Sequence, residues 1–238
     1  MTQIANTGER ILLEKETPLM IARHFSAYRF AKDFVAGKRI LDIGCGEGYG
    51  TYFLAGFAKE AIGIDYDPAV ISLAQKKYKR DNLQFYAVKA EECRAIGGKF
   101  DAVCSFQVIE HINEPRHYLS NIKGLLNEKG VFICSTCNKL DSSPNSPVPL
   151  NKFHVREYLL SDFRMLLEGF FREVEIYGLV RSRKLKFMRR LKKSGILRFL
   201  PPALNPVDKF FSRADHRDFI IIKEGLDPAL DFIALCRE

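Results

Sequence analysis

The chain has 238 residues, of which 47% are hydrophobic, so it can bury the core of an α/β domain and wholesale disorder is excluded. None of its apolar runs approaches the ~20 residues of a membrane-spanning helix, and residues 1–10 lack the pattern of a secretory leader. The net charge of +8 is localised, because residues 181–213 contain 11 Lys or Arg and one acidic residue, so this segment carries +10 and the rest carries −2.

Strand-like and helix-like segments alternate along the chain. Pro18 opens the first expected helix, over 18–35, and Gly37 ends it. The other expected helices cover 49–57, 68–79, 115–126 and 155–169, with a short helical turn near Glu91. The expected strands cover 38–43, 61–65, 83–88, 100–106, 130–136, 172–179 and 231–238. Such alternation predicts an α/β fold whose mostly parallel sheet has helices on both faces.

These elements suggest how the chain is divided. We expect an N-terminal helical cap over 1–36, a Rossmann-like core over 37–177, a basic helical insert over 178–227 and a last core strand over 228–238. The six cysteines fall mostly in strand-like segments, where cysteine acts as a small apolar core residue. We therefore expect a reduced, cytoplasmic protein.

A glycine-rich turn, ILDIGCGEGYG over 40–50, follows the first expected strand. Its glycines permit a close approach of the backbone to a ligand. The dinucleotide pattern G-x-G-x-x-G does not fit, because its third glycine position, counted from Gly44, is Tyr49. A carboxylate at Asp42 would repel a pyrophosphate and attract a cation. S-adenosylmethionine, which carries an ammonium and a sulfonium but no phosphate, satisfies both conditions.

A second acid supports the same ligand. Asp65 ends the next expected strand, where a carboxylate can accept hydrogen bonds from both ribose hydroxyls. Tyr66 beside it can pack its ring on the adenine. Taken alone, Asp65 could instead cap a turn, but the two acids and the glycine turn agree in register with the expected strands.

Three stretches resemble the successive motifs of class I S-adenosylmethionine-dependent methyltransferases. They are ILDIGCGEGYG, AIGIDYDPAVISLAQKK and FDAVCSFQVIEHINEPRHYLSNIKGLLNEKGVFICST, and the resemblance covers about 38–139. It implies a seven-stranded sheet of order 3-2-1-4-5-7-6, with the last segment of the chain as strand 7. It also implies the cofactor S-adenosylmethionine and the product S-adenosylhomocysteine.

The resemblance also assigns residues to the cofactor site. Asp42, Gly44, Cys45 and Gly46 would surround the methionine end of the cofactor. The other expected contacts lie at the ends of the next strands: Asp65, Tyr66, Ala90, Glu91, Phe106 and Gln107. Many relatives carry an aspartate after strand 3 where this chain has Lys89, so adenine recognition would fall to Glu91 or to the backbone.

Two histidines are candidates for a general base that removes the proton of a hydroxyl acceptor. His111 comes just after the fourth expected strand and titrates near neutrality, and His154 is the second candidate. Arg156 and Tyr158 are candidate substrate contacts. Each has an alternative interpretation: His111 could orient its loop together with Glu110, and the later residues could start a helix.

The acceptor class rests on a further resemblance. The opening TGER, the helix around HFSAYRFAKDFV and the later FHVREYLLSDFRMLLEGFF are similar to bacterial methyltransferases associated with glycosyltransferases and surface-polysaccharide assembly. This implies a sugar hydroxyl as acceptor, with Arg10, His24 and Tyr28 lining the site. A quinone or lipid precursor is the alternative acceptor, and a non-catalytic cofactor-binding subunit is the alternative of another class.

The basic segment 181–213 has three open interpretations. A basic amphipathic helix suits an anionic membrane surface, which would fit a lipid-linked acceptor and a peripheral location. RNA phosphates would suit the same charge, and a helical lid that buries its apolar stripe is the third possibility. An RNA methyltransferase is disfavoured because the expected Pro-Cys after strand 4 is replaced by SFQVIE.

Cysteine spacing argues against a metal ion. Cys134 and Cys137 form a C-x-x-C pair, but no second pair stands at zinc-ligand spacing. The sequence therefore predicts no metal site.

Overall fold

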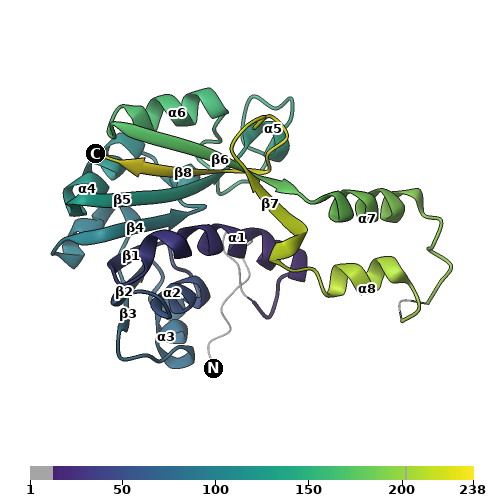
Figure 1. Cartoon of the computed structure of the whole chain (residues 1–238), viewed down its shortest axis with the longest axis horizontal. Coiled ribbons are helices and arrows are strands. Elements are labelled where there is room, and N and C mark those ends of the chain that lie inside the picture. The colour runs from purple at the N-terminus through teal and green to yellow at the C-terminus, as the bar shows by residue number, and fades with distance from the viewer. Residues whose placement is uncertain (1–12, 202) are drawn as a thin grey trace.

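The computed structural model describes residues 13–201 and 203–238, and this part of the chain is built around one mixed sheet of eight strands (Figure 1). The strands are β1 Arg39–Ile43, β2 Glu60–Asp65, β3 Leu83–Ala87, β4 Phe100–Phe106, β5 Leu126–Cys137, β6 Glu173–Arg181, β7 Phe219–Ile222 and β8 Asp231–Arg237. They are ordered β3-β2-β1-β4-β5-β8-β6-β7 across the sheet. β1 to β5 are mutually parallel, and β8 lies antiparallel between β5 and β6.

The Rossmann-like methyltransferase fold expected from the sequence is confirmed, but the expected number of seven strands is wrong. The order from β3 to β6 matches 3-2-1-4-5-7-6 when β8 takes the place of strand 7. The eighth strand, β7, lies inside the segment expected to be helical and pairs antiparallel with residues 178–181 of β6. Its sequence FIII is a short apolar run without alternation, so it gives a weak strand signal.

Helices fill the connections between strands. They are α1 Pro18–Val35, α2 Tyr49–Ala55, α3 Pro68–Lys77, α4 Pro115–Leu125, α5 Lys139–Ser142, α6 Leu160–Glu168, α7 Arg183–Ser194 and α8 Pro206–Ser212. The short 3-10 helices are η1 Ala90–Ile96, η2 Ile109–His111 and η3 His216–Asp218. The start of α1 follows from its sequence, because the Thr17 hydroxyl accepts a hydrogen bond from the Met20 amide and Pro18 is pre-shaped for a first helical turn.

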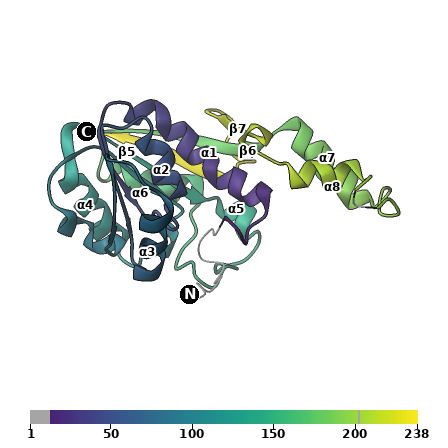
Figure 2. The same ribbon diagram turned by 90° about the horizontal axis from the view of Figure 1, so that it is seen from below.

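The two faces of the sheet carry different helices (Figure 2). Side chains alternate along β1, so that Ile40 belongs to the core on the α1 and α2 side, while Leu41 and Ile43 belong to the core on the α4 and α6 side. α1 buries mostly small side chains against the sheet, including Ala27 and Ala31. These small residues allow the helix to run close to the ends of the strands that form the site.

The helix expected over 155–169 begins only at Leu160. The amides of Val155 and Arg156 instead donate to the carbonyl of Glu110, and Tyr158 forms an isolated bridge with Asn138. These backbone bonds tie the segment to η2 and to the residue after β5. Tertiary pairing therefore overrides the helical pattern of the sequence at this point.

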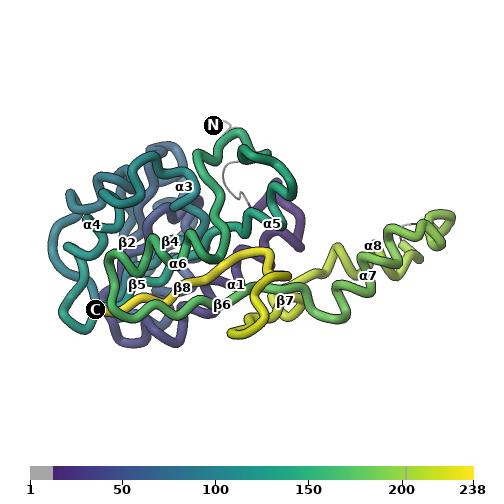
Figure 3. Tube along the Cα trace, turned by 90° about the horizontal axis from the view of Figure 1, so that it is seen from above, coloured from purple at the N-terminus to yellow at the C-terminus, as the bar shows by residue number. Residues whose placement is uncertain are grey.

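α7 and α8 form an arm that projects away from the sheet (Figure 3). At its base, buried Leu185 packs with Leu179 and Phe219. Among the described residues, no helix is long and apolar enough to cross a membrane.

Candidate active site

A cavity of about 690 Å³ opens at the carboxyl ends of the parallel strands. Its walls come from the ends of β1, β2, β4 and β5, the turn after β3, the start of β8, α1 and the loop before α6. In an open α/β sheet this edge is where ligands bind. Of the expected site residues, the cavity is lined by Gly44, Cys45, Gly46, Asp65, Tyr66, Ala90, Glu91, Phe106, Gln107, His111 and His154.

The turn after β1 forms one end of the cavity. The amides of Gly44 and Cys45 both donate to the Ile64 carbonyl, which ties the turn to the end of β2. The Gly46 amide donates to one carboxylate oxygen of Asp65, and the Asp67 amide donates to the other, at 3.1 Å each. Asp65 is therefore fixed with its carboxylate at the cavity wall.

Two glycines of this turn have positive φ for different reasons. At Gly44, φ is +74° and an added Cβ would lie 2.4 Å from Val108 Cγ2, so a side chain is excluded by packing. At Gly46, φ is +53° and an added Cβ would meet nothing within 4 Å, because this glycine faces the cavity. The space beside Gly46 is open because glycine has no side chain, and the fixed Asp65 carboxylate lies next to it. Such a space fits the ribose and methionine portions of S-adenosylmethionine.

Asp42 lies beneath the turn and is not part of the cavity wall. Thr51 Oγ1 donates to its Oδ2 at 2.6 Å and Tyr28 Oη donates to the same oxygen at 3.2 Å, while Oδ1 has no hydrogen-bond partner among the described residues. Burial, aided by nearby Asp65, raises the pKa of Asp42 to about 7 even though the Thr51 and Tyr28 donors lower it. The Asp42 carboxylate can therefore attract a cationic cofactor through its charge, but it does not line the cavity where it could contact the cofactor directly.

Tyr28 is placed differently from the expectation that it lines the site. It is buried below the cavity, where its hydroxyl holds Asp42 and its ring packs edge-on against Phe106 at 4.7 Å between centroids. Tyr28 thus supports the floor of the cofactor end. Arg10 lies outside the described residues.

A second part of the cavity wall contains the two expected histidines. His111 Nδ1 lies 2.9 Å from the Phe153 carbonyl, which can only accept, so this nitrogen carries the proton and neutral His111 has its lone pair on Nε2. The two rings meet edge to face, with 4.9 Å between centroids. The structure therefore brings together His111 and His154, which are 43 positions apart in sequence.

His154 is oriented from both sides. Its Nδ1 donates to Glu157 Oε1 at 2.8 Å, and the side-chain amide of Asn151 donates to its Nε2 at 2.9 Å. Burial opposes ionisation of Glu157, but polar contacts with Ser143 and His154 lower its pKa overall. Both ring nitrogens of His154 are thus occupied by neighbouring side chains.

The remaining two expected substrate contacts do not line the cavity. Arg156 is exposed on the outer side of its loop, and Tyr158 is buried in the core with its ring 5.7 Å from that of Phe163. Glu157, between these two residues, is buried and lines the cavity.

Sequence reasoning missed an ion pair in the cavity wall. Both nitrogens Nε and Nη2 of Arg23 donate to the Asp231 carboxylate, at 2.7 and 2.6 Å. Arg23 comes from α1 and Asp231 opens β8, so no local pattern links them. His24, which the sequence placed at the site, lines the cavity beside them; burial lowers its pKa to about 4, so it is neutral near pH 7.

Comparisons with known proteins agree with this geometry. Residues 34–165, more than half of the chain, match the family model "Methyltransferase domain". The chain is 36% identical, over 171 residues, to a probable S-adenosylmethionine-dependent methyltransferase of Mycolicibacterium smegmatis, and the match covers 71% of this chain and 65% of that protein. It is 37% identical over 105 residues to a ubiquinone biosynthesis O-methyltransferase of Cereibacter sphaeroides, with 43% and 42% covered. The chain thus spans less than two thirds of the length of these relatives.

Solved structures show the same fold. A methyltransferase of Thermotoga maritima, described as a possible histamine N-methyltransferase, superposes with a TM-score of 0.63 at 15% identity, covering 92% of this chain and 90% of that one. The magnesium protoporphyrin IX methyltransferase of Synechocystis with bound S-adenosylmethionine gives a TM-score of 0.51 at 20% identity, covering 69% and 74%.

The two glycines predict separable mutant effects. Gly44→Ala should lower the free energy of unfolding by roughly 2–4 kcal/mol, from backbone strain and the collision with Val108. Gly46→Ala should lower it by only about 1–2 kcal/mol, but should weaken S-adenosylmethionine binding at least tenfold because its methyl group enters the cavity. Denaturant unfolding and calorimetric titration measure the two effects. Unchanged cofactor affinity in Gly46→Ala would remove this turn from the binding site.

The buried acid predicts how cofactor binding depends on pH. A cation bound nearby stabilises ionised Asp42, so binding should release a proton near pH 7, and the affinity for S-adenosylmethionine should rise with pH between about 6 and 8. Calorimetry in two buffers of different ionisation enthalpy measures the released proton. Asp42→Asn should remove that part of the proton release; an equal release in this variant would assign it to another group.

Proposed function

The chain belongs to the methyltransferase domain family as a class I S-adenosylmethionine-dependent enzyme, and from that premise we propose that it methylates a hydroxyl oxygen of a sugar in a glycan precursor. The observation that carries the proposal is the polar acceptor end of the cavity. There, two histidines, an Arg–Asp ion pair and a buried carboxylate converge opposite the glycine turn: His111, His154, Arg23, Asp231 and Glu157. An acceptor with several hydroxyl groups can satisfy such a set of donors and acceptors.

His111 is the proposed general base. Its Nδ1 proton is held by the Phe153 carbonyl, so Nε2 accepts the hydroxyl proton as the acceptor oxygen bonds to the methyl carbon. The cofactor supplies that carbon on a sulfonium, whose C–S bond breaks and leaves the electron pair on sulfur. His111 ends the step as an imidazolium, so charge and protons balance. The remaining cavity residues align the two reactants.

A quinone or lipid precursor is the second candidate acceptor. The partial similarity to a ubiquinone biosynthesis O-methyltransferase favours it, and apolar side chains such as Met20, Val108 and Leu179 also line the cavity. Both candidates are hydroxyl acceptors, so the same base serves either one. They differ in the fraction of a cell extract in which the methyl group should appear.

The test uses methyl-labelled S-adenosylmethionine. The purified full chain is incubated with an extract of its source cells, and the label is then separated into glycolipid and polysaccharide, small apolar molecules, and RNA. We expect label in the glycolipid or polysaccharide fraction. Label confined to small apolar molecules would replace the sugar by the quinone-type acceptor, and label confined to RNA would overturn the acceptor class.

A variant of the base tests the mechanism in the same assay. His111→Gln should reduce transfer about 10²–10⁴-fold, the usual contribution of a general base, with the affinity for S-adenosylmethionine little changed. His117→Gln is the matched control, because this histidine is exposed on α4 and does not line the cavity. Equal loss in both variants, or no loss in His111→Gln, would contradict the assignment.

A further inference from the structure

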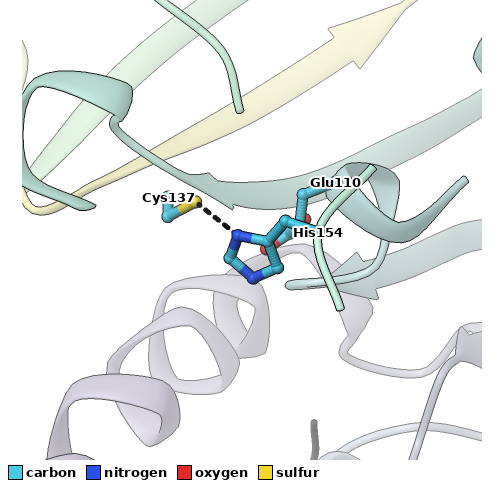
Figure 4. A group of neighbouring side chains, drawn as sticks. All are labelled: Glu110, Cys137 and His154. Carbon is cyan, nitrogen blue, oxygen red and sulfur yellow. Dashed lines mark hydrogen bonds between the residues drawn. The ribbon is translucent and has the colours of Figure 1, made fainter. Parts of the chain in front are cut away.

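Three side chains in the cavity wall form a group with the chemistry of a metal site (Figure 4). They are Glu110 from η2, Cys137 at the end of β5 and His154 from the loop before α6. One ligand atom of each lies within 4.8 Å of the other two. We propose that they bind a zinc ion whose remaining coordination position faces the acceptor end of the cavity.

The Glu110 carboxylate gives an independent indication of a cation. The side chain is fully buried; Thr136 Oγ1 donates to Oε2 at 3.2 Å, while Oε1 has no hydrogen-bond partner among the described residues. A buried carboxylate with an unsatisfied oxygen is costly unless a proton or a cation compensates it. Burial raises the pKa of Glu110 to about 8, which is consistent with a proton taking that place when no cation is bound.

The distances suit zinc. Cys137 Sγ lies 3.9 Å from His154 Nδ1. Zinc bonds of about 2.3 Å to sulfur and about 2.0–2.1 Å to nitrogen put the two atoms about 3.5 Å apart at a tetrahedral angle. Bringing these two atoms to that separation therefore needs a movement of only a few tenths of an ångström. A thiolate, an imidazole and a carboxylate together favour zinc over magnesium or calcium, which prefer oxygen ligands alone.

The surrounding charges are compatible with a cation. His154 Nδ1 now donates to Glu157 Oε1. A metal on this nitrogen moves the proton to Nε2, where the Asn151 amide would turn its oxygen to accept it, and gains the Glu157 carboxylate beside it. The Arg23 guanidinium, which also faces this region, is paired with Asp231. The local acids therefore outnumber the cation that could repel a metal.

A zinc ion held by three side chains would keep one position open, which is the usual arrangement of a catalytic zinc. All three ligands line the cavity, so that position is available to an acceptor hydroxyl. Zinc would lower the pKa of such a hydroxyl and make its proton easier for His111 to accept. The catalytic role of the ion rests on the proposed function, but the existence of the ion-binding site does not depend on it.

Metal binding by the full chain is the test. Protein freed of metal by dialysis against a chelator is titrated with Zn²⁺ and with Co²⁺, whose thiolate complexes absorb in the near ultraviolet. We expect one equivalent to bind and Co²⁺ to give the thiolate band. Cys137→Ser, Glu110→Gln and His154→Asn should each weaken binding at least tenfold, and Cys137→Ser should abolish the band.

Matched controls are Cys93→Ser, whose cysteine lies in the core away from the cavity, and His117→Asn on the surface. Circular dichroism confirms that each variant is folded. No stoichiometric binding, or equal affinity in Glu110→Gln and the wild type, would overturn the proposal. If the protein binds zinc but the methyl label does not appear in glycolipid, the metal site is supported and only the acceptor class is contradicted.

A separate observation concerns the α7–α8 arm, which projects from the sheet in all three views (Figures 1–3). The stripe of Leu185, Met188 and Leu191 is buried or half-buried along α7. Other apolar side chains are exposed on the segment that joins the helices: Ile196 by 64%, Phe199 by 78% and Leu204 by 65%. Phe187 on α7 is also exposed, by 63%, so exposed apolar side chains lie both on α7 and at the far end of the arm.

Cations accompany these apolar side chains along α7. Lys186, Arg190, Lys192 and Lys193 are exposed along α7, and no acidic side chain among the described residues pairs with them. Exposed apolar anchors beside unpaired cations match an anionic lipid surface, which takes the anchors into its interfacial region and the cations at its headgroups. We infer that the arm docks the protein on an anionic membrane surface.

Vesicle co-sedimentation of the full chain tests the docking. Binding to phosphatidylglycerol-containing vesicles should exceed binding to phosphatidylcholine vesicles at least tenfold. It should fall at least tenfold in Ile196→Asp/Phe199→Asp and in Lys192→Glu/Lys193→Glu. Val148→Asp/Leu150→Asp and Lys76→Glu/Lys79→Glu are matched controls, with exposed residues away from the arm. Equal binding to both vesicle types, or tight RNA binding without vesicle binding, would overturn the inference.

Discussion

The burial of the Asp42 carboxylate beneath the glycine turn is the constraint on which the site depends. Thr51 and Tyr28 donate to it, so one acid joins α1, β1 and α2 at the point where the turn begins. Its pKa rises from 3.8 unfolded to about 7 folded, so the folded chain holds more protons in this range, and the contribution of Asp42 to stability falls as pH rises from about 4 to 7. Near neutral pH the fold thus carries a destabilising acid, which a cationic ligand above the turn would offset.

The parts of the fold that follow from the sequence are those encoded by neighbouring residues. Thr17 and Pro18 start α1, Asp67 and Pro68 start α3, and glycines at 44 and 46 fix the turn after β1. Because parallel strands end at one edge of the sheet, Asp65 could be assigned to the cavity wall from its position alone. β7 could not be found in this way, since four apolar residues in a stretch expected to be helical become a strand only through the free edge of β6.

The acceptor end could be predicted much less well, because it is assembled from distant segments. Arg23 pairs with Asp231 across 208 positions, and the amides of Val155 and Arg156 bond to the Glu110 carbonyl, next to His154. Arg156, expected as a substrate contact, is exposed instead, while Glu157, which the sequence did not single out, lines the cavity. The two cysteines of the C-x-x-C pair lie in different surroundings: Cys134 faces the core, and Cys137 lines the cavity.

The arm and the cavity are mechanically connected through β6. Leu179 lines the cavity and also packs with Leu185 at the base of α7, in a cluster that includes Ala22 on α1, one residue before Arg23. A force on the arm therefore reaches the helix that carries the Arg23–Asp231 pair. If the arm rests on a lipid surface, the same cluster would set the orientation of the acceptor end relative to that surface.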